Sequence, residues 1–176
     1  SNTLEINSFT VDTSPGVFVA VGYSGAILRS TDNGSTWDNA TSPTGNNLKG
    51  VTWGNNTFVA VGASVNILRS TDNGSSFNNV THGGGSNLLE AVTFGNNTFV
   101  AVGYSGTIVR STDNGTTWAS VTSGTNENLL GAGFANNTFV VSGGCNSCNG
   151  VGNILRSTDN GSSWDNVTSR TGNTLD

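Results

Sequence analysis

A fourfold internal repeat constrains this chain more than any other feature of its sequence. The string Arg-Ser-Thr-Asp-Asn-Gly begins at four arginines, 40, 41 and 46 residues apart: Arg29, Arg69, Arg110 and Arg156. The extra residues of the last interval fall within 143–152, where Cys145-Asn146-Ser147-Cys148 interrupts what is Tyr-Ser-Gly in two other copies. An insertion confined to one turn indicates a loop. The period predicts one small structural unit repeated four times.

One repeat has the pattern of four short strands. In the second copy an apolar first strand over 47–54 ends at Gly54-Asn55-Asn56, a strong turn signal. Further strands are predicted over 58–62, 67–70 and 77–81, the last two separated by Asp72-Asn73-Gly74. No segment carries a helical period. The repeat therefore predicts a four-stranded antiparallel meander of about 40 residues.

The apolar pattern predicts how these meanders pack. The run Phe-Val-Ala-Val-Gly, at 18–22, 58–62 and 99–103, is apolar on both faces of a strand, so neighbouring sheets are expected to cover both faces. The fourth strand, for example 37–41, is mostly polar and is expected at an outer edge. These features predict an all-β fold of four β-propeller blades, possibly part of a larger propeller or oligomer. A flat sandwich built from the same hairpins is the competing fold.

The repeat also sets expected boundaries. We expect blade 1 at 1–44, blade 2 at 45–84, blade 3 at 85–124 and blade 4 at 125–168. Residues 169–176 match the opening of the other copies, so they are expected to start a further repeat or to pair with another chain. The alternatives are a segment of a longer chain and a protomer that self-associates through open terminal strands.

The turn between the third and fourth strands carries the most specific motif. It reads Ser-Thr-Asp-Asn-Gly and is followed, after two intervening residues, by a large aromatic. In such a turn the carboxylate accepts from backbone N–H groups, Asn-Gly supplies positive-φ positions, and the aromatic covers the hairpin. We expect twelve residues to have this structural role: Asp32, Gly34, Trp37, Asp72, Gly74, Phe77, Asp113, Gly115, Trp118, Asp159, Gly161 and Trp164.

The pattern Ser-x-Asp-x-Gly-x-x-Trp resembles the Asp-box, or BNR, repeat of sialidase-like and photosystem-assembly-factor-like propellers. The resemblance covers all four repeats, and only Phe77 departs from the pattern. It implies a propeller in which the Asp box is structural and lies on the face opposite the usual ligand site. A calcium site is the alternative, but each turn offers one Asp followed by neutral residues, whereas calcium takes six or more oxygens. We expect no metal and no cofactor.

The remaining residues do not form a catalytic constellation. The resemblance implies that a sialidase would need an arginine triad, a Tyr/Glu pair and an acidic Asp, whereas the arginines here, apart from Arg170, take one equivalent position per repeat. Glu5, Glu90 and Glu127 lie near the starts of first strands and could line one face, although solvated blade ends are the simpler interpretation. His82 has no neighbouring Cys or carboxylate that would make a triad, and is expected in an exposed loop.

The Cys145-x-x-Cys148 pair is expected to be a local disulfide that clips the inserted loop of an exported protein. A haem attachment site would need His where Asn149 stands, and a zinc site would need two further ligands. A thioredoxin-like pair would lie at a helix start, and no helix is predicted.

The charge balance argues against two classes of partner. There are 6 Lys+Arg against 11 Asp+Glu, giving a net charge of -5, which disfavours nucleic acid and anionic membrane surfaces. No apolar run approaches the roughly 20 residues of a membrane span.

Ligand candidates fall on the loops of the face opposite the motif. Tyr23 and Tyr104 combine apolar area with a hydroxyl, and His82 is the third candidate. The alternative is that each tyrosine packs its own turn. We expect a non-enzymatic extracellular or cell-surface module, or a periplasmic one, for scaffolding or for recognising a protein or glycan. Part of a sialidase-like glycoside hydrolase and an assembly factor of the photosystem type are the alternative functions.

Overall fold

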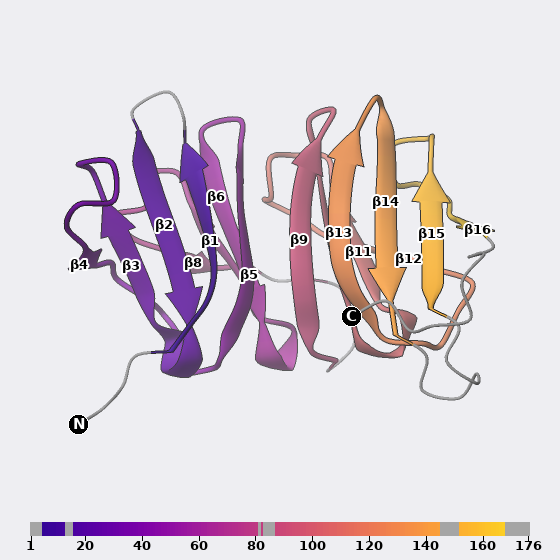
Figure 1. Cartoon of the computed structure of the whole chain (residues 1–176), viewed down its shortest axis with the longest axis horizontal. Helices are drawn as coiled ribbons and strands as arrows, with labels where there is room; N and C mark the ends of the chain where they lie inside the picture. The colour runs from indigo at the N-terminus through magenta and orange to yellow at the C-terminus, as the bar shows by residue number, and fades with distance from the viewer. Residues whose placement is uncertain (1–4, 13–15, 81, 83–86, 145–151, 168–176) are drawn as a thin grey trace.

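The described residues form four separate four-stranded antiparallel sheets. A computed structural model describes residues 5–12, 16–80, 82, 87–144 and 152–167. Each sheet is a meander in chain order, and the four sheets follow one another across the molecule in the order of the chain, from the sheet within residues 6–39 to the sheet within residues 129–167 (Figure 1). The prediction of an all-β fold of four four-stranded repeats is confirmed. The boundaries drawn between the repeats stay a prediction.

The strands are short, and each sheet, hereafter a blade, contains four of them. Blade 1 contains β1 (Ile6–Asp12), β2 (Val17–Gly22), β3 (Ile27–Ser30) and β4 (Asp38–Asn39). Blade 2 contains β5 (Leu48–Gly54), β6 (Thr57–Gly62), β7 (Ile67–Ser70) and β8 (Asn78–Asn79). Blade 3 contains β9 (Leu89–Gly95), β10 (Thr98–Gly103), β11 (Ile108–Ser111) and β12 (Ala119–Val121). Blade 4 contains β13 (Leu129–Ala135), β14 (Thr138–Gly143), β15 (Asn153–Ser157) and β16 (Asp165–Val167).

The only helical pieces within the described residues are three short 3-10 turns. They are η1 (Tyr23–Gly25), η2 (Ala63–Val65) and η3 (Tyr104–Gly106), each between the second and third strand of its blade. The first strands β1, β5, β9 and β13 contact one another in that order, so they form the inner edge of the array. The fourth strand lies at the other edge of each sheet, as its polar sequence predicts.

Three hydrophobic cores lie between successive blades. Val19 packs with Phe58, Val59 with Phe99, and Val100 with Phe139 in the three cores. The second strands of blades 2 and 3 are therefore buried on both faces, as expected. The second strand of blade 1 differs from the prediction, because Phe18 faces away from blade 2 and is only half-buried. Among the described residues no blade covers that side.

Each inner strand contains a β-bulge that the sequence did not reveal. The antiparallel register skips one residue near the start of every first strand, at Asn7, Lys49, Glu90 and Leu130. A bulge leaves the extra residue out of the ladder and re-aims its side chain. The same position in all four blades is therefore free to carry different chemistry.

Candidate functional site

The meander separates two faces of the molecule. The first strand of a blade ends at a hairpin loop, such as Asn55–Asn56, and the third strand ends at the Asp-Asn-Gly turn. Both kinds of loop lie at the same end of the blades, and we call this end the turn face. The 3-10 turns and the starts of the inner strands lie at the opposite ends. We call that end the tyrosine face and define it by five residues: Tyr23, Lys49, Glu90, Tyr104 and Leu130.

On the turn face every Asp-Asn-Gly turn closes on its own Asp. In blade 3, Asp113 Oδ1 accepts from Ser111 Oγ at 2.8 Å and from the Thr117 backbone N–H at 2.9 Å. Its Oδ2 accepts from Thr117 Oγ1 at 2.6 Å. Ser111 Oγ in turn accepts from the Gly115 N–H at 2.9 Å. The same bonds recur around the Asp of the other three turns, Asp32, Asp72 and Asp159.

These bonds hold each carboxylate in its charged form. The Thr117 hydroxyl, followed by its backbone N–H and the Ser111 hydroxyl, outweighs partial burial and lowers the pKa of Asp113 to about 2. Thr36 and Ser30 donate in the same way to Asp32, whose pKa is also lowered to about 2. For Asp72, burial acts to raise the pKa, but bonds from Ser76 and Ser70 lower it on balance. The Asp159 pKa is lowered by Ser163 and Ser157.

The aromatic that follows each turn covers the same hairpin. Trp118 Nε1 donates to the Gly115 carbonyl at 3.1 Å, and Trp37 Nε1 donates to the Gly34 carbonyl at the same distance. Asn114 and Gly115 take the positive φ values of 60° and 78° that the turn requires. The indole N–H groups of Trp37 and Trp118 are thus bonded within their own turns, whereas Trp164 Nε1 is buried without a hydrogen-bond partner. Both oxygens of each turn carboxylate also accept hydrogen bonds within the turn.

The tyrosine face is built on the 3-10 turns. The Tyr23 N–H donates to the Glu5 carbonyl at 3.1 Å and the Tyr104 N–H to the Leu88 carbonyl at 2.9 Å. The next residue of each turn, Ser24 or Ser105, donates its N–H to an Asn side chain of the following loop, at 2.9 and 3.1 Å. The backbone of both turns is thus fixed to its surroundings. The two tyrosines are each 39% exposed, so the turns hold them at the surface.

The bulge residues lie beside these turns and differ in chemistry. Lys49 places Nζ 5.5 Å from the centre of the Tyr23 ring, within cation–π range. Leu130, also 39% exposed, lies next to Gly144, which takes the position of Tyr23 and Tyr104 in blade 4. Glu90 takes the same bulge position in blade 3. The face therefore combines a cation, a carboxylate, an exposed aliphatic side chain and two aromatic rings.

The other sequence candidates lie elsewhere or are not described. His82 is half-buried, and its backbone forms a parallel bridge with Trp118, so the expectation of an exposed loop histidine is wrong. Its neighbourhood is the outer strand region and not the tyrosine face. Glu127 contributes its carbonyl, which accepts from the Gly106 N–H at 2.7 Å. Cys145 and Cys148 lie outside the described residues.

Neither a metal-binding cluster nor a membrane-spanning helix is present among the described residues. No three His, Cys, Asp or Glu side chains within the described ranges are grouped to hold a metal ion. In the part of the chain that the structure describes, no helix has the length and apolar character to cross a membrane.

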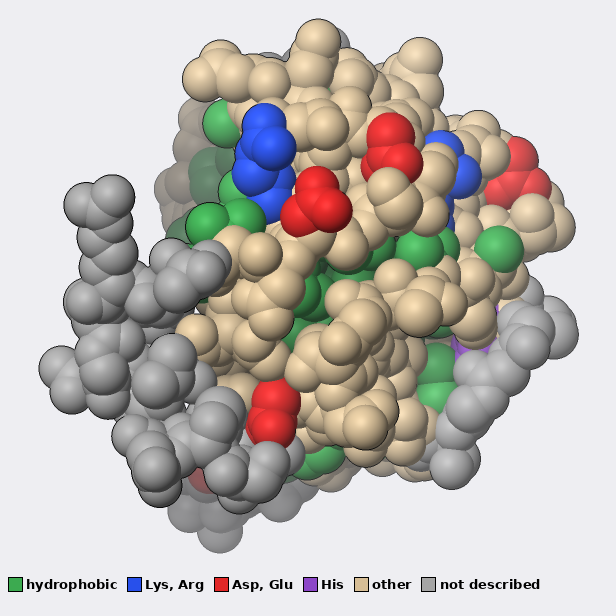
Figure 2. All heavy atoms as spheres, turned by 90° about the vertical axis from the view of Figure 1, so that its right-hand side faces the viewer, with side chains coloured by type: hydrophobic (Ala, Val, Ile, Leu, Met, Phe, Trp, Pro, Cys, Tyr) green, Lys and Arg blue, Asp and Glu red, His purple; other side chains and the backbone are tan. Residues whose placement is uncertain are grey.

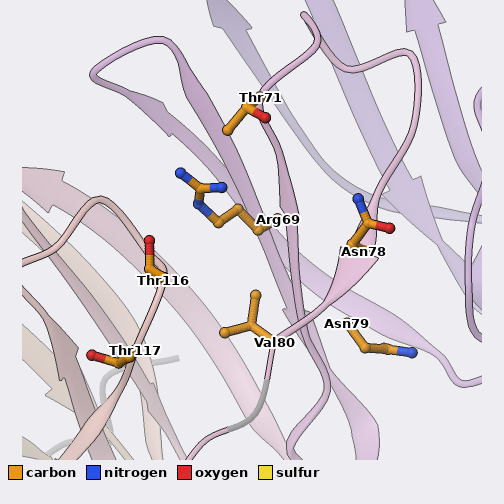
Figure 3. A pocket seen from close by; sticks show the side chains of 7 residues that line it. All are labelled: Arg69, Thr71, Asn78, Asn79, Val80, Thr116 and Thr117. Atoms are coloured by element: carbon orange, nitrogen blue, oxygen red, sulfur yellow. The ribbon is translucent and has the colours of Figure 1, made fainter.

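A polar hollow of about 370 Å³ lies between the outer parts of blades 2 and 3. Figure 3 shows Arg69 and Asn78 on one side of it, with Thr116 and Thr117 on the other. Arg69 Nε donates to the Asn114 carbonyl at 2.7 Å, and equivalent bonds join Arg29 and Arg110 to the next turn. Because every junction repeats this arrangement, we interpret the hollow as a feature of blade packing.

Comparisons with known proteins establish the fold. No family model matches the chain, and no curated protein matches it. Among solved structures, YCF48 bound to D1 peptide is similar with a TM-score of 0.72 and 18% identity, over 96% of this chain and 56% of that one. YCF48 from Cyanidioschyzon merolae has a TM-score of 0.69 and 16% identity, over 94% and 57%. A GH74 xyloglucanase from Xanthomonas campestris has the same TM-score and identity, over 92% of this chain and 30% of the enzyme.

These likenesses show a shared fold at low identity. The chain spans little more than half of the YCF48 structures and under a third of the xyloglucanase. The four sheets are blades of a β-propeller, in agreement with the sequence prediction.

Proposed function

We propose that this chain is a non-catalytic recognition module that binds an extended segment of a partner protein on its tyrosine face. The observation that carries the proposal is that the two tyrosines, each 39% exposed, stand on hydrogen-bonded turns beside bulge residues of unlike chemistry. Exposed tyrosines on a fixed backbone lose little conformational entropy on binding and supply large contact area. The likeness to YCF48 bound to D1 peptide supports a protein partner.

The turn motif supports a non-enzymatic role. We propose that the four Asp-Asn-Gly turns are Asp boxes with a structural function, since each carboxylate is occupied by donors of its own turn. A general acid at neutral pH needs a raised pKa, whereas the pKa values of Asp32 and Asp113 are lowered to about 2. The function of a photosystem-type assembly factor fits the same surface. A glycoside hydrolase would need its carboxylates elsewhere.

Glycan recognition is the second candidate. A tyrosine ring offers an apolar face with a hydroxyl, and the xyloglucanase shows that a sugar-processing enzyme uses a similar fold. We also propose an extracellular or cell-surface location. Its support is the sequence, which has a single lysine and an inserted loop with two cysteines.

Affinity selection from a library of random 12-residue linear peptides tests the function. Enriched peptides are then measured against Tyr104→Ala and against Asp113→Ala, which lies on the turn face. We expect Tyr104→Ala to weaken binding at least about tenfold with an unchanged melting temperature, the loss typical of an interface hot spot. Asp113→Ala should bind as the wild type does. Absence of any enriched peptide, together with binding of xyloglucan oligosaccharides, would favour the glycan candidate.

A further inference from the structure

The three junctions between blades share one two-sided pattern. The earlier blade presents a valine and an isoleucine from its second and third strands, as Val19 and Ile27 do. The later blade presents the aromatic residue of its second strand and that of its turn, as Phe58 and Phe77 do. The turn glycine of the later blade completes the contact, because a Cβ on Gly115 would lie 3.2 Å from Val59 Cγ2.

Blade 1 exposes the side that later blades bury. Its residues at the equivalent positions line an open apolar hollow of about 450 Å³: Ile6, Phe9, Phe18, Leu28, Gly34 and Trp37. Phe9 is 69% exposed and Trp37 is 38% exposed, whereas Phe77 and Trp118 are 2% and 5% exposed at the Trp37 position. Burying such aromatic area is the main source of association energy in proteins.

Blade 4 exposes the opposite side of the same pattern. Val140 is 42% exposed, whereas its equivalents Val19, Val59 and Val100 are fully buried. Figure 2 views the molecule from this end and shows hydrophobic side chains exposed across the middle of the face. Blade 4 thus has the valine side of a junction, and blade 1 has the aromatic side.

The residues that form the polar bonds of a junction are also present at the two open faces, with the donors and acceptors of one side on blade 4 and those of the other side on blade 1. At the second and third junctions, Arg69 and Arg110 donate Nε to the carbonyl of an Asn in the next turn, Asn114 and Asn160, at 2.7 and 2.6 Å. Those Asn side chains donate Nδ2 to Thr57 and Thr98 of the earlier blade, at 2.7 and 2.6 Å. Blade 4 offers Arg156 and Thr138 at these positions, and blade 1 offers Asn33.

Side-chain sizes at the two open faces are matched to each other. Inside the chain Gly54 lies against the Phe94 ring and Gly95 against the Phe134 ring, so closely that a Cβ would overlap the ring. At the position of Gly54, blade 4 has Ala135, which is larger than glycine. At the position of Phe94, blade 1 has Val11, which is smaller than phenylalanine.

A second pair of positions is matched in the same sense. Gly50 of blade 2 lies against the backbone of Ala91 and Val92 in blade 3. The equivalents are Gly131 in blade 4 and Phe9 in blade 1, the latter a phenylalanine where blades 2 and 3 have valine. Two residues after Gly131, on the same side of the strand, lies Gly133, where a Cβ would meet nothing within 4 Å. One end face therefore has open space at Gly133, and the other has a larger residue at Phe9 than blades 2 and 3 have at the same position.

We propose that the two end faces bind each other between copies of this chain, with blade 4 of each copy on blade 1 of the other. Two identical chains joined in this way have two equal junctions and close into a ring of eight blades. In this contact Asn33 of one copy would bond to Arg156 and Thr138 of the other, as the equivalent residues do at the second and third junctions.

The test measures mass by light scattering after size exclusion, across a dilution series. The wild type is expected at twice the 17.9 kDa of one chain. Phe9→Arg and Val140→Arg each spoil one face and should each give a single chain. The two variants mixed still share one intact pair of faces, so the mixture should recover the mass of two chains. Asn79→Arg, which adds the same charge on the exposed outer strand β8, should leave the wild-type mass unchanged.

The outcomes separate the alternatives. A wild type that stays a single chain throughout the series, or a series of larger masses, would overturn the two-chain ring. A mixture that stays at one chain, or a Val140→Arg variant that still forms pairs, would show that the aromatic faces bind each other instead. Circular dichroism checks that each variant remains folded. If Phe9→Arg does not fold, Ile6→Arg on the same face, 43% exposed in the wild type, replaces it.

Discussion

The turn face and the tyrosine face of this propeller are built from the same repeat but differ in how strictly they repeat. On the turn face every blade has the same Ser-Thr-Asp-Asn-Gly sequence and the same hydrogen bonds. On the tyrosine face the equivalent bulge positions are Asn7, Lys49, Glu90 and Leu130. The difference teaches that the repeated positions maintain the blade, while the positions released from the ladder vary in chemistry, and three of these four positions belong to the face on which we propose that a partner binds.

Removing Trp118 should have the largest effect on the turn face. Trp118→Ala should lower the free energy of unfolding by about 3–5 kcal/mol, since the indole is 5% exposed and packs 6.3 Å from the Phe99 ring centre. Trp37→Ala is the matched control, because Trp37 makes the same turn bond but is 38% exposed. Urea unfolding in the Val140→Arg background keeps self-association out of the comparison. Equal losses would show that the neighbouring blade does not matter.

The close approach between inner strands gives the next largest effect. Gly54→Ala should cost about 1–3 kcal/mol, because the added Cβ would overlap the Phe94 ring. Gly45→Ala, in a loop where a Cβ meets nothing within 4 Å, should change stability by less than about 0.5 kcal/mol. Urea unfolding of both variants measures the difference. A tolerated Gly54→Ala would mean that the blades can separate at this point.

Loss of a turn carboxylate should have a smaller effect. Asp113→Ala removes the acceptor of three donors and should lower the free energy of unfolding by about 0.5–2 kcal/mol, as loss of a helix cap does. Asp38→Ala, at an exposed site on the outer strand β4, should fall within about 0.5 kcal/mol of the wild type. Thermal and urea unfolding report both. A neutral Asp113→Ala would remove the structural role assigned to the turn.

The same carboxylate should give a pH signature. The pKa of Asp113 is lowered from 3.8 to about 2, so its contribution to stability is complete above about pH 4 and falls as pH drops toward 2. Asp113→Asn lacks this titration. We therefore expect the gap in melting temperature between wild type and Asp113→Asn to shrink between pH 4 and pH 2. A gap that stays constant over this range would contradict the assigned hydrogen bonds.

Much of the fold was readable because the repeat signals strands and turns locally. The third strand over 67–70 begins and ends where predicted, and the Gly54-Asn55-Asn56 signal marks a real hairpin. The burial of individual side chains was harder to predict from the sequence, because Trp37 and Trp118 lie in the same motif but have different neighbours. A preceding blade covers Trp118 and none among the described residues covers Trp37.

The site was only partly predictable. The exposed tyrosines were identified because the turn that carries them recurs in two copies. The contact of Lys49 with Tyr23 was not, because a bulge inserts one residue into a strand without any change in composition that marks it. His82 was misplaced since its bridge to Trp118 joins different blades, which local sequence does not report.

The division of roles between the two faces is tested most directly by amide chemical shifts during titration with a selected peptide. The account predicts that signals of Tyr23, Lys49 and Tyr104 shift with peptide concentration, and that those of Asp72 and Asp113 stay in place. Shifts concentrated at the Asp-Asn-Gly turns, with the tyrosine turns unchanged, would contradict it.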